Sequence, residues 1–553
     1  MKIVVVGAVA GGASCAARCR RLDESAEIVV LDKGEDASFA NCGMPYFIGG
    51  EITDRNSLSV QTPASLKARL ELDVRLMQDA TSIDPIEKRV HVRNLKDGSE
   101  YTLDYDELVL ALGAKPFIPN IPGIDRKGSF QLRTLQDMDH IDTWITQQQA
   151  KSAVVCGGGF IGIEMAEQLT KRGLKVTLIE AMPQLLGPFD PEMAALVHSE
   201  LEANGVTVLT GCSVSGFEAG ECKASIVVAG DRRVESDLVM LGFGVRPDTT
   251  VASAAGVQVN NRGGILVDAF MRTHVDHIWA VGDDVEIDNP TVHQPWMVSL
   301  AGPANRQGRL CADNIYKAER KYKGTFGSSI LRSFSLTAAC TGMNELGLKQ
   351  AGVHYECVHL HPMSHAGYYP GASSIALKCL FEIGGANQGR LLGAQAVGKD
   401  GVANRMNVLA TALQARMTME DLAELELCYA PPFGSAKDPV NFAGMIAMNI
   451  LEGKVETIQW HELKKVAKDA FVLDVRNASE IEANGAVCDT ALNIPVNDLR
   501  GRMNEVPKNK LILVSCASGQ RSYYACRILI QNGYKCKNLD GASITLLGSR
   551  TKL

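Results

Sequence analysis

The sequence predicts an α/β protein built from several domains. A strand, a glycine-rich turn and a helix follow one another near the start of the chain, and the same order returns after residue 150. Residues 461–553 also alternate apolar strands with helical stretches. With 553 residues, the chain exceeds the size at which a single hydrophobic core keeps growing, so several domains are expected.

The composition excludes several classes of partner. Lys and Arg number 56 against 63 Asp and Glu, without long runs of either sign, which argues against nucleic acid or an anionic membrane surface. The sequence has no run of 18 apolar residues, so it predicts no membrane span. The 15 cysteines are scattered, which fits a reducing cytoplasm better than a disulfide framework, and most of them are expected to be inert core residues.

The first glycine turn has the pattern of a dinucleotide-binding unit. Gly7 and Gly12 occupy the outer positions of G-x-G-x-x-G, Val9 replaces the middle glycine, and Asp32 ends the next strand. Such glycines let backbone N–H groups approach a pyrophosphate, and the acid binds ribose hydroxyls.

The second turn matches the pattern in full. Its glycines are Gly157, Gly159 and Gly162, and Glu180 closes the following strand. Two such units in one chain point to two dinucleotides. Segments 108–119 and 238–248 each run from an apolar strand into a glycine turn, as expected where the chain crosses between two nucleotide domains.

With these two units and the "AVGDD" segment, the chain resembles the pyridine nucleotide-disulfide oxidoreductases over residues 1–445. The resemblance implies FAD at the first turn and NADH or NADPH at the second. The FAD residues would be Gly7, Gly12, Asp32 and Asp283, and the NADH residues Gly157, Gly159, Gly162 and Glu180. Since the Glu180 carboxylate would repel a 2′-phosphate, we expect NADH rather than NADPH. The alternative is an α/β protein with glycine turns and no cofactor.

Cys42, in "SFANCG", is the candidate redox residue. A single thiol cannot form an internal disulfide, so its oxidised form would be a sulfenic acid or a mixed disulfide with a small thiol. The segment resembles the single-cysteine branch of the family, which contains coenzyme A disulfide reductases, NADH oxidases and NADH peroxidases. The oxidases and peroxidases carry a histidine where this chain has Ala10, which favours the disulfide reductases. An oxidase or peroxidase, a redox sensor without turnover, and a packing role for Cys42 stay open as alternatives.

Two tyrosines follow from the same resemblance. "SHAGYYPGAS" and "ELCYAPPFGSAKD" resemble the family's α+β dimerisation domain, in which a tyrosine of each segment reaches the cysteine of the partner subunit. They correspond to Tyr368 and Tyr429, and they imply a homodimer. A phenol O–H could protonate a departing thiolate. The alternative is that they are turn and packing residues.

A coenzyme A site is predicted on the first helix. Ser14, Arg18 and Arg21 share one helical face, and clustered guanidinium groups suit phosphates. The resemblance adds Ser38, Asn41 and Lys437 to this site. The two arginines could instead be a solvated helix face.

The C-terminal segment offers a second sulfur site. The loop "CASGQRS" lies between a strand and a helix start, so backbone N–H groups and Arg521 would surround the Cys516 sulfur. This loop and its place resemble a rhodanese domain, and Asp474 matches its bracing acid, whereas "NGAVCDTA" replaces the usual "GHIPGA". The alternative is a core cysteine.

The combination resembles fusions of coenzyme A disulfide reductase with rhodanese, which reduce persulfides with NADH. It implies coenzyme A disulfide, persulfide or polysulfide as acceptor, with coenzyme A held on Cys42 as a mixed disulfide, and no metal. The predicted domains are FAD-binding at 1–115 and 245–322, NAD-binding at 116–244, dimerisation at 323–447, a linker at 448–460, and rhodanese-like at 461–553.

Overall fold

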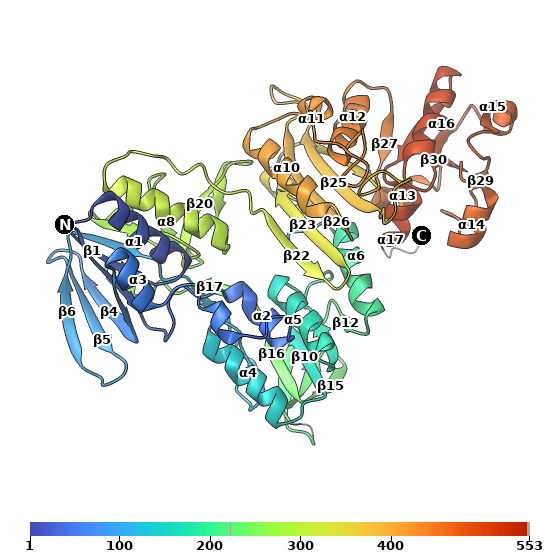
Figure 1. Ribbon diagram of the computed structural model, residues 1–553. Coiled ribbons are helices and arrows are strands. Elements are labelled where there is room, and N and C mark those ends of the chain that lie inside the picture. Colours follow the sequence, from blue (N-terminus) through green and yellow to red (C-terminus); the bar gives the residue numbers. More distant parts are fainter. Residues whose placement is uncertain (222, 550–553) are drawn as a thin grey trace. The chain divides into compact units, whose positions relative to one another are not determined.

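The computed structural model describes residues 1–221 and 223–549 (Figure 1). Residues 550–553 of the predicted rhodanese-like domain lie outside the described residues. The chain divides into two compact units, which are Met1–Pro183 with Gly205–Gly327, and Gln184–Asn204 with Ser328–Leu553. Helices and parallel strands alternate in both units, so the predicted α/β class is confirmed.

The first unit contains a parallel sheet built on the N-terminal strand, in the order β19-β7-β1-β2-β3. Its strands are β1 (Lys2–Val6), β2 (Glu27–Asp32), β3 (Asp73–Leu76), β7 (Glu107–Leu110) and β19 (Ile278–Ala280). β1 is apolar after Lys2 and its last four residues are buried, as expected for a central parallel strand covered on both faces. Helix α1 (Ala10–Leu22) packs against α8 (Ala301–Ile315), so closely that a Cβ on Gly308 would lie 2.1 Å from the Gly11 carbonyl oxygen.

A second parallel sheet in this unit repeats the design, in the order β12-β11-β10-β16-β9. Its strands are β9 (Ser129–Phe130), β10 (Ser152–Cys156), β11 (Lys175–Ile179), β12 (Thr207–Leu209) and β16 (Leu238–Leu241). The crossing segments predicted between the two nucleotide domains pair with each other as β8 (Ala114–Pro116) and β17 (Val245–Pro247).

Two antiparallel three-stranded sheets complete the main layers of the first unit. They are β4 (Gln78–Asp84), β5 (Arg89–Asn94) and β6 (Glu100–Asp104), and β13 (Val214–Glu218), β14 (Ser225–Ala229) and β15 (Arg232–Ser236). The other helices and strands of this unit include α2 (Met44–Ile48), α3 (Pro63–Leu70), α4 (Leu135–Gln147), α5 (Phe160–Lys171), α7 (Thr250–Ala254), β18 (Ile265–Leu266), β20 (Val285–Asn289) and β21 (Gln294–Trp296).

The second unit begins with an antiparallel sheet in the order β22-β23-β26-β25-β24. Its strands are β22 (Ser329–Ser333), β23 (Leu336–Gly342), β24 (Tyr355–Leu360), β25 (Ile375–Glu382) and β26 (Leu391–Gly398). β25 and β26 are buried almost throughout, so both faces of the sheet are covered. The helices packed on it are α6 (Pro191–Ala203), α10 (Val402–Gln414) and α12 (Pro439–Leu451), with α9 (Glu345–Ala351) and α11 (Met419–Glu424) nearby.

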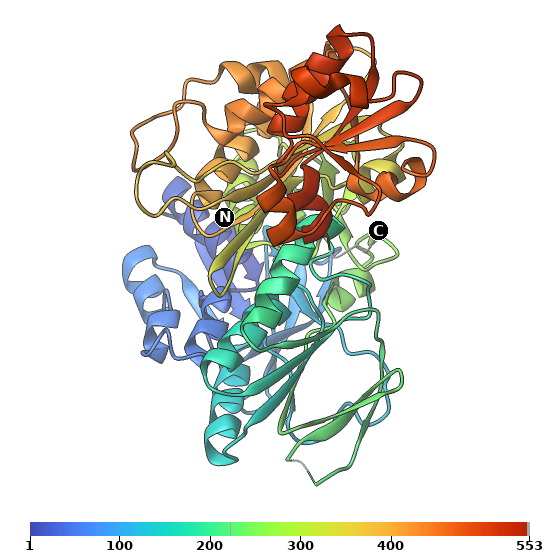
Figure 2. The same ribbon diagram turned by 90° about the vertical axis from the view of Figure 1, so that its right-hand side faces the viewer.

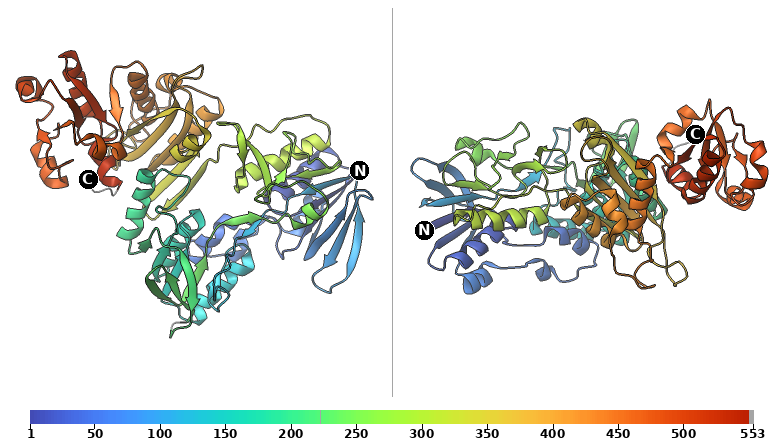
Figure 3. Two further views of the ribbon diagram at one scale, coloured as in Figure 1. Left: turned by 180° about the vertical axis from the view of Figure 1, so that it is seen from behind. Right: turned by 90° about the horizontal axis from the view of Figure 1, so that it is seen from above.

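The chain continues into a parallel sheet, drawn in red in Figures 2 and 3, in the order β27-β31-β30-β28-β29. Its strands are β27 (Glu456–Ile458), β28 (Phe471–Asp474), β29 (Leu492–Asn493), β30 (Leu511–Ser515) and β31 (Lys535–Leu539). The connecting helices are α13 (Trp460–Val466), α14 (Ala478–Asn484), α15 (Leu499–Arg502), α16 (Gln520–Gln531) and α17 (Ala542–Gly548). Among the described residues, no helix combines the length and the apolar character needed to cross a membrane.

Candidate active site

The first glycine turn leaves no room for side chains. Gly7 has φ +112°, and a Cβ there would lie 2.0 Å from the Ala111 carbonyl oxygen. A Cβ on Gly12 would lie 1.9 Å from the Gly7 carbonyl oxygen. Val9, the N-cap of α1, supplies no side-chain hydrogen bond, so the first N–H groups of this helix are left for a ligand.

The second turn has the same geometry. Gly157 has φ +114°, and its Cβ would lie 2.1 Å from the Gly242 carbonyl oxygen, while a Cβ on Gly162 would lie 1.9 Å from the Gly157 oxygen. Gly159 caps α5 without a side chain. By contrast, α3, α4 and α11 are capped by threonine side chains. The two nucleotide helices thus share the uncapped start that a pyrophosphate needs, and the residues present fit two dinucleotides.

The predicted ribose-binding acids lie against these turns. Asp32 accepts hydrogen bonds from the N–H groups of Ala8 at 2.7 Å and Gly34 at 2.8 Å. Glu180 does the same at the second turn, where the N–H groups of Gly158 and Met182 donate at 2.6 and 2.7 Å. Both carboxylates are therefore held at the carboxyl ends of their strands, where ligands bind in this kind of sheet.

Asp283 follows β19 and is half-buried. Burial raises the pKa of its carboxyl group, and the charge of Arg133 opposes that rise. The neighbouring Asp284 is fully buried and accepts a hydrogen bond from the Leu112 N–H at 2.8 Å. Asp284 was not among the residues predicted from the sequence, and its contact with Leu112 holds the crossing segment 108–119 in place.

Cys42 is the accessible thiol of the first unit. It lies in a 3₁₀ turn, Asn41–Gly43, immediately before α2. Among the cysteines that the structure describes in this unit, Cys42 alone is exposed, Cys212 is half-buried, and Cys15, Cys19, Cys156 and Cys311 are buried. Partial desolvation raises the pKa of the Cys42 thiol, and the negative charges of Glu164 and Asp283 add to that rise. The charges that act on Cys42 thus come from the residue after β19 and from the helix of the second glycine turn.

Glu164 is a candidate residue that sequence reasoning missed. It lies on α5 and accepts a hydrogen bond from the Tyr46 hydroxyl of α2 at 3.1 Å. This contact joins the helix that follows Cys42 to the helix of the second nucleotide turn. Its position two residues after Gly162 was the only signal for it in the sequence.

Two of the three predicted coenzyme A residues on α1 form contacts within the chain. The Ser14 hydroxyl donates to Asn305 at 2.5 Å, and Arg18 donates to the buried carboxylate of Asp313 at 2.6 Å. Arg21 is exposed and has no hydrogen bond or ion pair among the described residues.

The remaining predicted coenzyme A residues lie in loops. Ser38 has φ 45° and donates its N–H to the Ala8 carbonyl at 2.8 Å, which places it beside the first glycine turn. Asn41 donates its side-chain amide to the Arg133 carbonyl at 3.3 Å. Lys437 lies in the second unit and is exposed.

The second unit brings the two predicted tyrosines together. The Tyr368 and Tyr429 hydroxyls lie 3.2 Å apart, with 78% and 48% of the side chains exposed. This hydrogen bond raises the pKa of Tyr368. Phe433, four residues after Tyr429 in the chain, is 75% exposed. Such an apolar and aromatic surface is typical of a protein interface.

Cys516 begins the loop between β30 and α16. Its sulfur accepts hydrogen bonds from the Gly519 N–H at 3.2 Å and from the Ser522 hydroxyl at 3.3 Å. Gly519 has φ +98° and is the N-cap of α16, so the chain curls around the sulfur before the helix starts. The sulfur therefore sits in a cradle of donors that suits a thiolate or a persulfide.

Arg521, which was predicted to lie close to the Cys516 sulfur, is held by another residue. Its guanidinium group forms a bidentate ion pair with Glu480 of α14, at 2.6 and 2.7 Å. This pair lowers the pKa of Glu480 to about 2 and raises the pKa of Arg521. Glu480 was missed from the sequence because 41 positions separate it from Arg521.

Asp474, the predicted bracing acid, is almost fully buried and forms a 2.6 Å ion pair with the equally buried Arg476. Asn493 donates to the carbonyl groups of both residues, at 2.9 and 2.8 Å. These bonds tie β28 to β29 at one end of the sheet.

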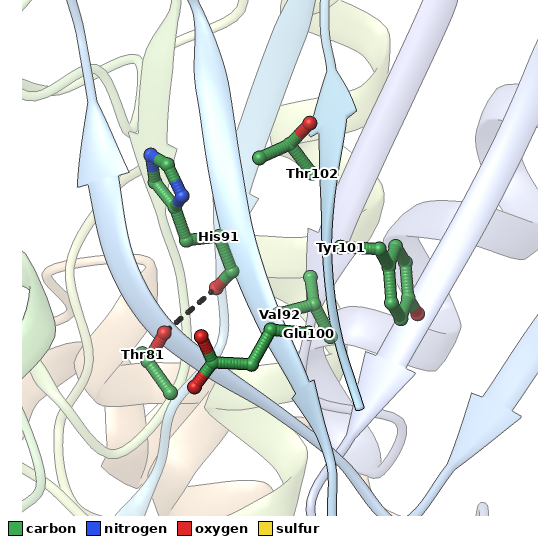
Figure 4. Close-up of a pocket in the computed structure, with 6 residues that line it drawn as sticks. All are labelled: Thr81, His91, Val92, Glu100, Tyr101 and Thr102. Atoms are coloured by element: carbon green, nitrogen blue, oxygen red, sulfur yellow. Dashed lines mark hydrogen bonds between the residues drawn. The ribbon is translucent and has the colours of Figure 1, made fainter. Parts of the chain in front are cut away.

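A surface pocket of about 150 Å³ lies on the β4–β5–β6 sheet (Figure 4). It is lined by Thr81, His91, Val92, Glu100, Tyr101 and Thr102, and Thr81 donates a hydrogen bond to the His91 carbonyl at 3.3 Å. None of the predicted site residues lines it, so it is not part of the candidate active site.

Similarity to solved structures extends over nearly the whole chain. The crystal structure of reduced Bacillus anthracis CoADR-RHD is 43% identical to this chain with a TM-score of 0.96, and the match covers 99% of this chain and 98% of that one. A NAD-dependent persulfide reductase from A. fulgidus is 37% identical with a TM-score of 0.92, covering 99% and 100%.

Curated relatives match about four-fifths of the chain. A coenzyme A disulfide reductase of Staphylococcus haemolyticus is 33% identical over 81% of this chain and 100% of its own length. An NADH oxidase of Methanocaldococcus jannaschii is 32% identical over 82% and 100%.

Three family matches divide the chain. Residues 331–439 match the dimerisation domain of the pyridine nucleotide-disulphide oxidoreductases, and residues 458–543 match the rhodanese-like domain. Residues 1–301, more than half of the chain, match the pyridine nucleotide-disulphide oxidoreductase family itself. The chain therefore belongs to the pyridine nucleotide-disulphide oxidoreductase family and carries a C-terminal rhodanese-like domain.

Proposed function

We propose that this chain is an NADH-dependent flavoprotein that reduces coenzyme A disulfide, coenzyme A persulfide or polysulfide through Cys42. The observation that carries the proposal is the exposure of Cys42, whose thiol is under the charges of Asp283 and Glu164, while the other described thiols of that unit are wholly or partly buried. The relatives support it, since they include a coenzyme A disulfide reductase and a NAD-dependent persulfide reductase.

The cofactors follow from the two turns. Gly7, Gly12, Asp32 and Asp283 would hold FAD, and Gly157, Gly159, Gly162 and Glu180 would hold NADH. A bound FAD would supply the two-electron relay between NADH and a thiol. Glu180 favours NADH because its carboxylate, fixed by two N–H groups, would face the ribose hydroxyls and repel a 2′-phosphate.

Cys42 would do the sulfur chemistry. Its thiolate attacks one sulfur of coenzyme A disulfide, a mixed disulfide with Cys42 forms, and one coenzyme A thiolate leaves. Two electrons then cleave the mixed disulfide, which releases the second coenzyme A thiol and restores Cys42. Arg21 is free to meet the phosphates of coenzyme A, and Ser14, Arg18, Ser38, Asn41 and Lys437 complete the predicted site.

Tyr368 and Tyr429 would act on the partner's cysteine in a homodimer. Their exposed, hydrogen-bonded hydroxyls can share and pass a proton to a leaving thiolate. The match of residues 331–439 to a dimerisation domain supports this arrangement. The fourteen described cysteines, all free thiols, are consistent with work in a reducing cytoplasm.

The rhodanese-like domain would carry sulfane sulfur on Cys516. Its cradle of N–H and O–H donors supports a persulfide, and Arg521 adds positive charge nearby. The likeness to a persulfide reductase of the same length favours a sulfur-carrying role over a structural one.

An NADH oxidase is the second candidate, because one curated relative has that name. Ala10 in the first glycine turn argues against it, since it cannot take part in peroxide chemistry. NADH consumption should be measured without oxygen for each sulfur acceptor, and with oxygen alone. The proposal expects anaerobic turnover with a sulfur acceptor, whereas an oxidase would consume NADH only with oxygen.

A further inference from the structure

A buried ion network joins the β22-β23-β26-β25-β24 sheet, here called the dimerisation sheet, to the rhodanese-like domain within the second unit. Its centre is His359 on β24, which is 4% exposed. Its Nδ1 atom lies 2.7 Å from an Asp540 carboxylate oxygen, and its Nε2 atom lies 2.8 Å from a Glu192 oxygen. Asp540 also accepts two hydrogen bonds from the backbone N–H of His359, at 3.0 and 3.1 Å.

This geometry requires a protonated imidazole. A neutral ring has one nitrogen without hydrogen, and here each ring nitrogen faces a carboxylate oxygen. Both oxygens also accept another N–H, the Glu192 oxygen from Lys378 and the Asp540 oxygen from the His359 backbone, so they act as acceptors and both ring nitrogens donate. His359 is therefore an imidazolium that bridges Glu192 of α6 and Asp540 of the rhodanese-like domain. Lys378, fully buried, continues the network on the other side of Glu192, at 2.6 Å, and also contacts Asp190 and Glu345.

Asp540 is connected to the Cys516 loop through the start of α17. It precedes Gly541, the N-cap of α17. The N–H groups of Ser543 and Ile544, in the first turn of α17, donate to the carbonyl groups of Cys516 at 3.1 Å and Ala517 at 3.0 Å. The same helix touches the dimerisation sheet, where His361 Nε2 lies 2.8 Å from the Thr545 hydroxyl oxygen. α17 thus holds the Cys516 loop on one side and the dimerisation domain on the other.

We propose that His359, bridging Glu192 and Asp540, is a positioning residue that docks the rhodanese-like domain on the dimerisation sheet and, through α17, fixes the backbone of the Cys516 loop. Its consequence for sulfur transfer rests on the proposed function, but the docking itself does not. Loss of the bridge should loosen α17 and impair Cys516 chemistry while the Cys42 reaction with coenzyme A disulfide continues.

The proposal carries a pH dependence. The titratable and charged groups that face His359 come from every element packed against it: Cys357 from β24 itself, His361 directly after β24, Lys378 from β25, Glu192 from α6 and Asp540 from the turn before α17. The pKa of Cys357 is raised by burial to about 11, and that of His361 is lowered by burial to about 4, so neither titrates near neutral pH.

His359 itself has a pKa well above its usual value, because the Asp540 charge and hydrogen bond overcome the cost of burial. Undocked, the exposed ring would have an ordinary pKa of about 6.5. Above about pH 6.5, docking of the domain is therefore accompanied by protonation of His359. The stabilisation is complete below about pH 6.5 and is lost as the pH rises from there through the raised pKa of the docked state.

Hydrogen exchange of the full-length protein tests the docking directly. In His359→Gln, the protection factors of the Ser543 and Ile544 amides should fall at least about tenfold, while the buried strands β1 and β10 stay protected. In the wild type these protection factors should fall between pH 7 and 9, and in the variant they should not depend on pH. His198→Gln is the matched control, because it breaks a half-exposed pair with Glu202 on α6. It should change neither the protection factors nor their dependence on pH.

Sulfur transfer is measured on the same samples as thiocyanate formed from a sulfane donor and cyanide. Lost protection with impaired transfer and intact coenzyme A disulfide reduction supports the proposal. Unchanged protection overturns it, and so does lost protection with normal transfer. Stoichiometric zinc held by Cys357, His359 and Asp540 would also overturn it. If His359→Gln fails to accumulate, Asp540→Asn takes its place with the same expected results.

The exchange result does not depend on turnover. If the chain proved not to reduce sulfur compounds, the wild-type transfer and reduction assays would both be blank, and the docking would still be decided by protection of α17.

Discussion

The hydroxyl oxygens of Tyr368 and Tyr429 lie 3.2 Å apart, although 61 positions separate these residues in the chain. The pair lies on the surface of the second unit, with both rings largely exposed. A hydrogen-bonded pair can pass a proton in either direction, so the two residues are expected to act together on a leaving thiolate.

Removing one hydroxyl tests this. In Tyr429→Phe we expect kcat for coenzyme A disulfide to fall about tenfold to a hundredfold, because the proton donor is lost or badly placed. The reduction of the flavin by NADH should be unchanged. Stopped-flow measurement of flavin reduction alongside steady-state turnover separates the two steps, and an unchanged kcat would exclude a role for the pair in protonation.

Glu180 predicts the choice of nicotinamide. The wild type should have a higher kcat/KM with NADH than with NADPH, and in Glu180→Ala this preference should shrink about tenfold or more, since the carboxylate no longer repels a 2′-phosphate or binds the ribose. Steady-state kinetics with both nucleotides measures the ratio. A wild type that used NADPH equally well would contradict the assignment.

The variant Cys516→Ala distinguishes the role of Cys516 from that of Cys42. Coenzyme A disulfide contains no sulfane sulfur, so Cys516→Ala should reduce it at the wild-type rate, whereas polysulfide turnover should slow. Coenzyme A persulfide, small enough to reach Cys42 directly, should be affected least. NADH consumption with each acceptor provides the comparison, and an equal loss for all acceptors would indicate a purely structural domain.

The buried pair of Asp474 and Arg476 predicts a stability effect. Asp474→Asn would leave a buried guanidinium group without its counter-charge, which costs about 3–5 kcal/mol of the stability of the rhodanese-like domain. Thermal unfolding followed through Trp460, which lies within the matched rhodanese-like residues 458–543, reports the change. Glu505→Gln, which breaks an exposed pair with Arg502, should leave the midpoint unchanged.

Local patterns carried most of the fold prediction. Both glycine turns, their acids and the Cys516 loop are contained in short segments, because strand, turn and helix propensities act over a few residues. The family and the rhodanese-like domain predicted from these segments are confirmed. The predicted domain boundaries and site roles stay predictions.

Contacts between segments that are far apart in the chain could not be predicted from the sequence. The spacing put Arg18 on one helix face with Ser14, but its partner Asp313 is 295 positions away. Glu480 and Asp540 were missed for the same reason, since each acquires its role only when the fold brings Arg521 or His359 against it. A carboxylate in a helix or turn has no local signature that separates an ion-pair partner from a solvated side chain.

Cys42 tests the central claim most directly. The measurement is anaerobic NADH consumption with coenzyme A disulfide, comparing the wild type, Cys42→Ser and Cys212→Ser, a control at a half-buried thiol of the same unit. We predict that the wild type and Cys212→Ser form two coenzyme A thiols per NADH, and that Cys42→Ser forms none while its flavin is still reduced by NADH. Coenzyme A disulfide reduction by Cys42→Ser at the wild-type rate would contradict the account.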